Sequence, residues 1–262
     1  MHFDPATFLF GLLDNKLSSV ANEGIAGEDV FLLGSGPSID EVDLSAVRDS
    51  FVVGLNSAFS LFRYCGSGNR YFWFCQDTRA LLEFLPQVPR EVSKLVTIHR
   101  FNKYSQLRGF LGPGDRFLQP KISIFGQGQH HKPWRPRAWV PRPALKSGPP
   151  YLHDPTAAHL TLFPSTVMLT AISLFGGFGA RNIYCMGFDL TPIDKEGNKV
   201  SALVHQSYRT TGFPRDSISS YLVGLSEEMK RNGQTLWNCS PLTFERVLRK
   251  SRKFDKVGAN YD

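Results

Sequence analysis

The 262-residue sequence lacks several features that would place it in a common protein class. No apolar run approaches the roughly 20 residues that a membrane-spanning helix needs, so no such helix is expected. The four cysteines form no C-x-x-C pair, which argues against a zinc site and favours free thiols in a reducing cytoplasm. There is no Asp-x-Asp pair to hold a metal beside a nucleotide sugar. Neither G-x-G-x-x-G nor the G-K-[ST] of a P-loop occurs. We therefore expect no metal and no cofactor.

Acidic residues are scarce in one part of the chain. The net charge is +7, and residues 121–146 contain six Lys or Arg but no Asp or Glu. Such a segment suits an anionic partner, for instance an anionic glycan, lipopolysaccharide or a membrane surface, although a solvated basic face is an equally good interpretation. Prolines separate the basic residues, and they form no known nucleic-acid-binding module, so no specific nucleic acid is expected.

Apolar runs alternate with helical patterns along most of the chain. Continuous runs of this kind are typical of parallel strands that are covered on both faces. Strands are predicted in 30–33, 50–59, 70–77, 94–101, 181–190 and 234–241, and helices in 1–17, 79–85, 165–180, 217–233 and 242–253. The order predicts a single α/β domain over 1–262, with a Rossmann-like, mostly parallel sheet and helices on both faces. The first helix has no basic residue before its apolar run, so an amphipathic helix is expected rather than a secretory signal.

Residues from about 108 to 155 interrupt this alternation. The segment is rich in Pro, Gly and Arg, as in "GQGQHHKPWRPRAWVPRPALKSGPP". Loops of this length inside a domain commonly cover a site or bind a partner. We expect an irregular basic lid or insertion here.

Polar residues follow several of the predicted strands. Gly34 and Gly36 come directly after the first one, in "VFLLGSGPSIDEVDL". Glycines at this place let backbone N–H groups approach a phosphate, but a plain strand-to-helix turn would use them equally well. Asn56, Gln76–Asp77 and Asp189 end other strands. Because parallel strands end at one edge of the sheet, these residues are expected to lie near the same crevice.

The motifs "LLGSGPSIDEVDL", "VVGLNSAF", "STVMLTAISLFGGFGARNIYCMGFDL" and "NCSP" resemble the bacterial sialyltransferases of glycosyltransferase family forty-two. They are similar also to a wider Rossmann-like group that includes motility-associated glycosylation factors and a pterin pyrophosphokinase. The resemblance covers about 30–78 and 160–245, and it does not include the insertion. It implies a nucleotide site made of Gly34, Ser35, Gly36, Pro37, Ser38, Asn56, Gln76, Ser165, Thr166 and, at the end of a further strand, Asp189.

The sequence departs from this family at three places. Phe163 and Pro164 stand where the family has an arginine, and Leu190 and Thr191 follow Asp189 where it has a tyrosine. No histidine occupies the family's catalytic position in 211–216. The nearest is His205, with Tyr208 and Arg209 beside it. An imidazole can act as a general base near neutral pH, and the phenol and guanidinium can stabilise a departing phosphate. A surface histidine is the alternative.

The resemblance implies a metal-independent glycosyltransferase that uses a nucleotide-activated sugar, such as CMP-sialic acid, to build a bacterial cell-surface glycan. The acceptor would be an anionic glycan or lipopolysaccharide. Such an enzyme would be cytoplasmic, and attachment to the inner face of the membrane and a homo-oligomer are both compatible with it. Two alternatives stay open. One is a metal-dependent pyrophosphokinase-like enzyme with Asp77 and Asp189 as metal ligands. The other is a non-enzymatic nucleic-acid-binding protein.

Overall fold

The structure is a computed structural model. It describes residues 24–76, 78–97, 116–118, 120–121, 151–152, 154, 160–161, 166–189, 215–240 and 249–250. The predicted helix over 1–17 and most of the basic insertion lie outside these ranges. No helix among the described residues is long and apolar enough to cross a membrane.

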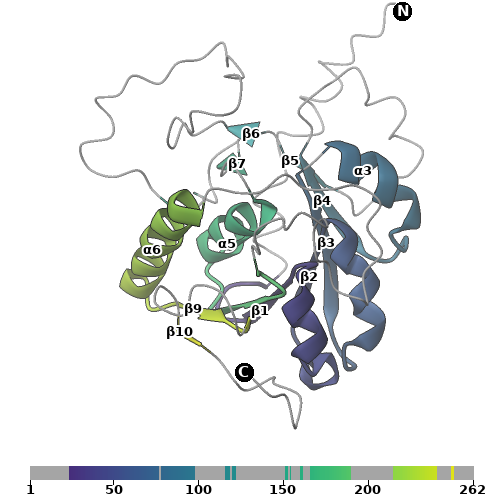
Figure 1. The fold of residues 1–262 in the computed structure, drawn as a ribbon, viewed down its shortest axis with the longest axis horizontal. Coiled ribbons are helices and arrows are strands. Elements are labelled where there is room, and N and C mark those ends of the chain that lie inside the picture. Colours follow the sequence, from purple (N-terminus) through teal and green to yellow (C-terminus); the bar gives the residue numbers. More distant parts are fainter. Residues whose placement is uncertain are drawn as a thin grey trace, which may run out of the picture.

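An eight-stranded sheet forms the centre of the fold (Figure 1), and its order is β10-β9-β8-β1-β2-β3-β4-β5. Every neighbouring pair is parallel. The strands are β1 (Asp29–Leu33), β2 (Phe51–Leu55), β3 (Arg70–Cys75), β4 (Ser93–Thr97), β5 (Arg116–Leu118), β8 (Asn182–Met186), β9 (Thr235–Asn238) and β10 (Arg249–Lys250). This topology confirms the predicted Rossmann-like α/β fold.

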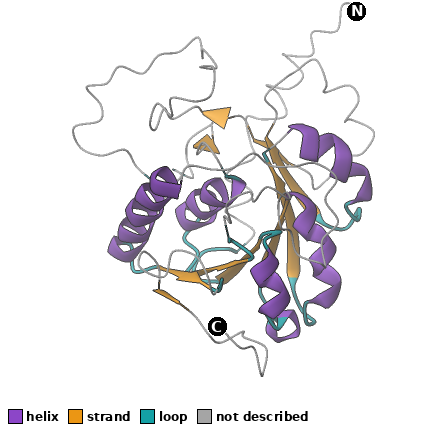
Figure 2. Cartoon of the chain, viewed as in Figure 1, coloured by secondary structure: helices purple, strands orange, loops and turns teal. Residues whose placement is uncertain are grey.

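Helices cover both faces of the sheet (Figure 2). On one face, Val30 and Leu32 of β1 belong to the apolar core that includes residues of α5 (Val167–Gly177) and α6 (Arg215–Arg231). Phe31 and Leu33 point to the other face, because successive side chains of a strand alternate. That face is covered by η1 (Pro37–Glu41), η2 (Leu44–Ala46), η3 (Asn56–Tyr64), α3 (Thr78–Phe84) and η4 (Leu85–Gln87).

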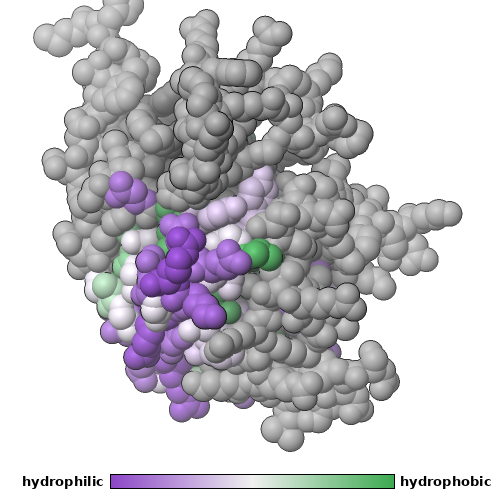
Figure 3. All heavy atoms as spheres, turned by 90° about the vertical axis from the view of Figure 1, so that its left-hand side faces the viewer, coloured by the Kyte–Doolittle hydropathy of each residue, from purple (hydrophilic) through white to green (hydrophobic). Residues whose placement is uncertain are grey.

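The two longer helices differ in how much of their surface is covered. Residues 168–176 of α5 are all buried, as expected for a helix that is apolar on every side. Helix α6 is amphipathic. Its buried residues Ile218, Leu222, Leu225 and Met229 follow helical spacing, whereas Glu227 and Lys230 are exposed. Figure 3 faces the side of the molecule where α6 lies and shows hydrophilic side chains gathered there.

Two sequence predictions need correction. The insertion is not structureless throughout, because Arg116–Leu118 is the edge strand β5 and β6 (Pro120–Lys121) pairs with β7 (Leu160–Thr161). The basic helix predicted over 242–253 contains strand β10 instead, which pairs with β9. In both places an available sheet edge decides the local structure, since main-chain pairing overrides a weak helical or irregular pattern.

The end of the insertion is anchored between α5 and α6. Tyr151 N–H donates to Glu228 Oε2 at 2.7 Å, and Ser173 Oγ donates to the Tyr151 carbonyl at 2.6 Å. The neighbouring Leu152 is buried in the core. Gly224 lies directly against the Tyr151 ring, and a side chain at that position would overlap the ring. Polar and apolar contacts therefore fix this point of the chain together.

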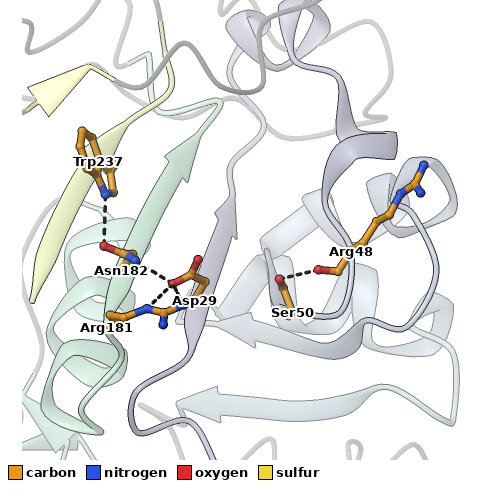
Figure 4. A network of polar contacts seen from close by, with 6 residues as sticks. All are labelled: Asp29, Arg48, Ser50, Arg181, Asn182 and Trp237. Carbon is orange, nitrogen blue, oxygen red and sulfur yellow. Dashed lines mark hydrogen bonds and ion pairs between the residues drawn. The ribbon is translucent and has the colours of Figure 1, made fainter.

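A polar network joins the amino ends of β1 and β8 to Trp237 of β9 (Figure 4). Asp29 Oδ1 accepts hydrogen bonds from Arg181 at 3.0 and 3.1 Å and from Asn182 Nδ2 at 2.8 Å. Trp237 Nε1 in turn donates to Asn182 Oδ1 at 3.3 Å. The Arg181 side chain is 61% exposed, so its ion pair contributes less than about 1 kcal/mol. The network fixes strand register at the edge opposite the predicted site.

Candidate functional site

The strand order makes the carboxyl ends of β1 and β8 the expected place for a ligand. From β1 the chain continues to β2 on one side, whereas from β8 it continues to β9 on the other. In open α/β sheets, ligands bind outside the carboxyl ends of the strands at such a change of direction. Two turns meet there. We call Gly34–Ser38, after β1, the glycine turn, and Gly187–Asp189, after β8, the aspartate turn.

Backbone hydrogen bonds join the glycine turn to β8 and to the turn that follows it. Gly34 N–H donates to the Met186 carbonyl at 2.8 Å, and Gly36 N–H donates to the Gly187 carbonyl at 2.9 Å. Ser38 N–H donates to Asp189 Oδ2 at 2.6 Å. The N–H groups of Gly34, Gly36 and Ser38 therefore all have acceptors inside the protein, and Pro37 has no N–H. The turn is thus not an open set of phosphate-binding N–H groups.

The same contacts explain why the turns contain glycine. A Cβ atom on Gly34 would lie 2.5 Å from the Gly187 carbonyl oxygen. A Cβ on Gly36 would lie 2.6 Å from that oxygen and would overlap Asp189 Oδ2. Gly187 has φ +66°, a left-handed conformation that favours glycine. The glycines allow two stretches of backbone to approach each other, as in the plain turn that the sequence allows beside a phosphate site.

Asp189 lies at the centre of this contact and is only 3% exposed. Burial raises the pKa of its carboxyl group, the hydroxyls of Ser38 and Ser240 lower it, and the nearby Asp40 raises it further. Asp189 Oδ1 is buried and has no hydrogen-bond partner among the described residues. The carboxylate therefore has one oxygen held by the glycine turn and one oxygen able to accept.

Asn238, the last residue of β9, and Ser240, just after it, complete this part of the site, and sequence reasoning missed both. Ser240 Oγ accepts a hydrogen bond from Phe188 N–H at 2.9 Å, which fixes the aspartate turn. Asn238 Oδ1 accepts from Ser240 N–H at 3.0 Å. The signal available for both was the "NCSP" motif at the end of the strand predicted in 234–241.

Asn56 and Gln76 follow β2 and β3, so they lie at the same edge of the parallel sheet. Asn56 has φ +51°, and its carbonyl accepts from Trp73 Nε1 at 2.6 Å. Its side-chain Oδ1 is buried and has no hydrogen-bond partner within the described ranges. The Gln76 side chain is half-buried.

Thr166 caps helix α5, and its Oγ1 accepts from Met168 N–H at 3.2 Å. Gly179, just after the opposite end of α5, accepts from Gly27 N–H near the amino end of β1. Thr166 therefore belongs to the carboxyl edge of the sheet. Its hydroxyl proton is left for another acceptor, because the cap uses only the oxygen.

The remaining predicted site residues lie outside the described ranges, and their roles stay predictions: Asp77, Ser165, His205, Tyr208 and Arg209. Within the described residues, no group of three or more His, Cys, Asp or Glu side chains could hold a metal ion.

Cys75, Cys185 and Cys239 are buried free thiols, as expected, and Cys65 is half-buried. Burial raises the pKa of Cys65 to about 12, so this thiol is not a nucleophile near neutral pH.

No protein-family model and no curated protein matches this sequence. Two solved structures are similar to it. One is the sialyltransferase CstII from Campylobacter jejuni in complex with the substrate analogue cytidine-5'-monophosphate, with 12% identity, a TM-score of 0.47 and coverage of 90% of each chain. The other is MAf glycosyltransferase from Magnetospirillum magneticum AMB-1, with 17% identity, a TM-score of 0.48 and coverage of 93% of this chain but 38% of that one. Both are glycosyltransferases, and the motifs predicted a resemblance of this kind.

Proposed function

We propose that this protein is a glycosyltransferase that takes its sugar from a nucleotide-activated donor. The proposal rests on the residues at the carboxyl edge of the sheet, where the glycine turn, Asn56 and Asp189 follow strands that lie side by side. The observation that carries it is Asn56.

Asn56 has two energetically unfavourable features. Its left-handed backbone costs on the order of 1 kcal/mol in a residue other than glycine. Leaving a buried oxygen such as its Oδ1 without a donor costs about 1–3 kcal/mol more. A bound nucleotide would supply the missing donor from a base or ribose group. The Asn56 side chain, whose Oδ1 lacks a hydrogen-bond donor, is therefore a good candidate for a nucleotide contact.

The chemistry of transfer would fall to residues outside the described ranges. His205 would remove the proton from the acceptor hydroxyl, and Tyr208 with Arg209 would stabilise the departing nucleotide phosphate. Ser165 and Thr166 would contact the same phosphate or the sugar. We propose a reaction without metal, a CMP-linked donor such as CMP-sialic acid, and an anionic cell-surface glycan or lipopolysaccharide acceptor. The basic residues of 121–146 would attract this acceptor or an anionic membrane surface.

A thermal-shift panel of nucleotides and nucleotide sugars, with and without magnesium, tests the donor. Binding at 100 times Kd stabilises a folded protein by about 2.7 kcal/mol, so a specific nucleotide should raise the Tm measurably without magnesium. Asn56→Gly should lose this shift while keeping the left-handed backbone. Asn232→Ala, which removes an exposed amide beyond α6, is the matched control and should keep the shift.

Three results would overturn the proposal: no nucleotide stabilises the wild type, Asn56→Gly responds as the wild type does, or ATP stabilises only with magnesium. The last would favour the pyrophosphokinase-like alternative. Once a donor and an acceptor are known, His205→Ala should lower kcat about 100- to 10,000-fold and leave the donor-induced Tm shift intact. A loss of less than tenfold would remove His205 from the mechanism.

A further inference from the structure

The glycine turn already holds an acidic oxygen of the protein itself. Ser38 N–H donates a hydrogen bond to Asp189 Oδ2 at 2.6 Å. Both residues are buried, with 5% and 3% of their surface exposed. The same oxygen lies so close to Gly36 that a Cβ atom there would overlap it. The place where a phosphate oxygen would bind this turn is occupied.

The surroundings of Asp189 also disfavour a phosphate. Phosphate-binding turns offer several free N–H groups to one anion, whereas Gly34, Gly36 and Ser38 all donate to β8 or to the aspartate turn. Asp40 on η1 lies near enough to act on Asp189 electrostatically, and both groups are acidic. Among the described residues, no Lys or Arg forms an ion pair with Asp189. A phosphate would meet an acidic environment with few donors.

The second oxygen of Asp189 suits a different group. Asp189 Oδ1 is buried and has no donor among the described residues. A carboxylate oxygen is only an acceptor, so the partner that it lacks is an O–H or N–H group. A neutral hydroxyl supplies that proton without the repulsion that a phosphate would meet.

We infer that Asp189 makes the glycine turn reject phosphate and bind an uncharged, hydroxyl-bearing group, the ribose of the donor. The identity of that group as ribose rests on the proposed function, whereas the rejection of phosphate does not. Asp189 Oδ2 holds the turn through Ser38, and Asp189 Oδ1 accepts the ribose hydroxyl. The donor phosphate then lies away from the glycine turn.

The first test follows the backbone amide NMR signals of Gly36 and Ser38 during titration with inorganic phosphate, and it needs no nucleotide. In the wild type these signals should not move with phosphate. In Asp189→Ala, which empties the acceptor position, they should shift and saturate. Saturating shifts in the wild type would overturn the inference. Asp189→Asn keeps an oxygen that can accept from Ser38 N–H, so its Gly36 and Ser38 signals should not move with phosphate. It replaces the alanine variant in the comparison if that variant does not fold.

The second test compares a nucleotide that binds the wild type with its 2′-deoxy and 3′-deoxy analogues. At least one analogue should bind tenfold or more weakly. In Asp189→Asn, an NH₂ group that cannot accept a hydrogen bond replaces Oδ1. The Kd values of the deoxy analogue and of the unmodified nucleotide should then agree within about twofold. The control Glu41→Gln removes an exposed acidic charge near the end of η1 and should keep the discrimination.

The outcomes of these tests separate the proposed function from the inference about Asp189. Equal binding of the nucleotide and both analogues to the wild type would overturn the ribose assignment. If no nucleotide binds the wild type, the proposed function fails, and the phosphate titration still decides whether Asp189 blocks the turn.

Discussion

Replacing Gly36 by alanine should destabilise the protein, although the backbone at this position suits any residue. Gly36 has φ −69° and ψ 152°, which is ordinary extended backbone. With free space around it, such a Gly→Ala change would stabilise the fold by about 0.4–1 kcal/mol, because the unfolded chain loses freedom. The sign of the measured change therefore reports directly on the space around this residue.

The structure leaves no such space. The new Cβ would lie 2.6 Å from the Gly187 carbonyl oxygen and would overlap Asp189 Oδ2. The glycine and aspartate turns would have to separate, which stretches the hydrogen bonds from Gly36 N–H and Ser38 N–H. Overpacking costs about 1–3 kcal/mol, and an unsatisfied buried group costs about as much again. We expect a net loss of about 1–5 kcal/mol, after subtracting the gain from the unfolded chain.

Urea unfolding followed by circular dichroism measures this loss as a lower midpoint with an unchanged m value. The control is Gly27→Ala, where φ is +79° and nothing lies within 4 Å of the new Cβ. It should cost about 1 kcal/mol from backbone strain alone. A Gly36→Ala protein as stable as the wild type would refute the argument from the close approach of the two turns.

Two further predictions concern Asp189 and the Tyr151 anchor. Burial raises the pKa of Asp189 above its ordinary 3.8, so its contribution to stability is complete below that pH and is lost as the pH rises through the raised pKa. Urea unfolding between pH 4 and 8 should show that the free energy of unfolding falls with pH in the wild type and falls less in Asp189→Asn. An equal fall in both proteins would contradict the raised pKa of Asp189. At the anchor, Glu228→Ala should cost about 1–3 kcal/mol, because Tyr151 N–H loses its acceptor, whereas Glu228→Gln keeps one and should cost less. Equal losses in the two variants would show that this hydrogen bond does not matter.

The parallel sheet and its main helices could be predicted because their signals are local. The run 70–77 contains β3, and the apolar stretch 165–180 contains α5. The strand β10 could not be predicted in the same way. "LTFERVLRKSRK" has a helical pattern, and only the position of β9 beside it makes Arg249 and Lys250 a strand. A short edge strand forms only by pairing with a neighbouring strand, and the local sequence does not show which strand that is.

At the site, too, the local features could be predicted from the sequence, whereas the contacts between distant segments could not. The sequence located Gly34, Gly36, Asn56 and Asp189 near strand ends, since each lies within a few residues of the end of an apolar run. It could not show that Ser38 N–H donates to Asp189, because 151 residues separate the two. A pairing over that distance depends on which strands become neighbours. For this reason the sequence alone leaves a phosphate site and a plain turn as equally good interpretations of the two glycines.

The pairing of β1 with β8 also has a consequence for folding. Strands β1 to β4 come from residues 29–97, whereas β8 and β9 come from residues 182–238. Contacts across so long a stretch of chain form slowly, because the loop must close before the contact contributes any energy. Neither half of the sheet contains both turns. A ligand at this edge would therefore bind only after the halves have joined, and it would lower the free energy of that joined state alone.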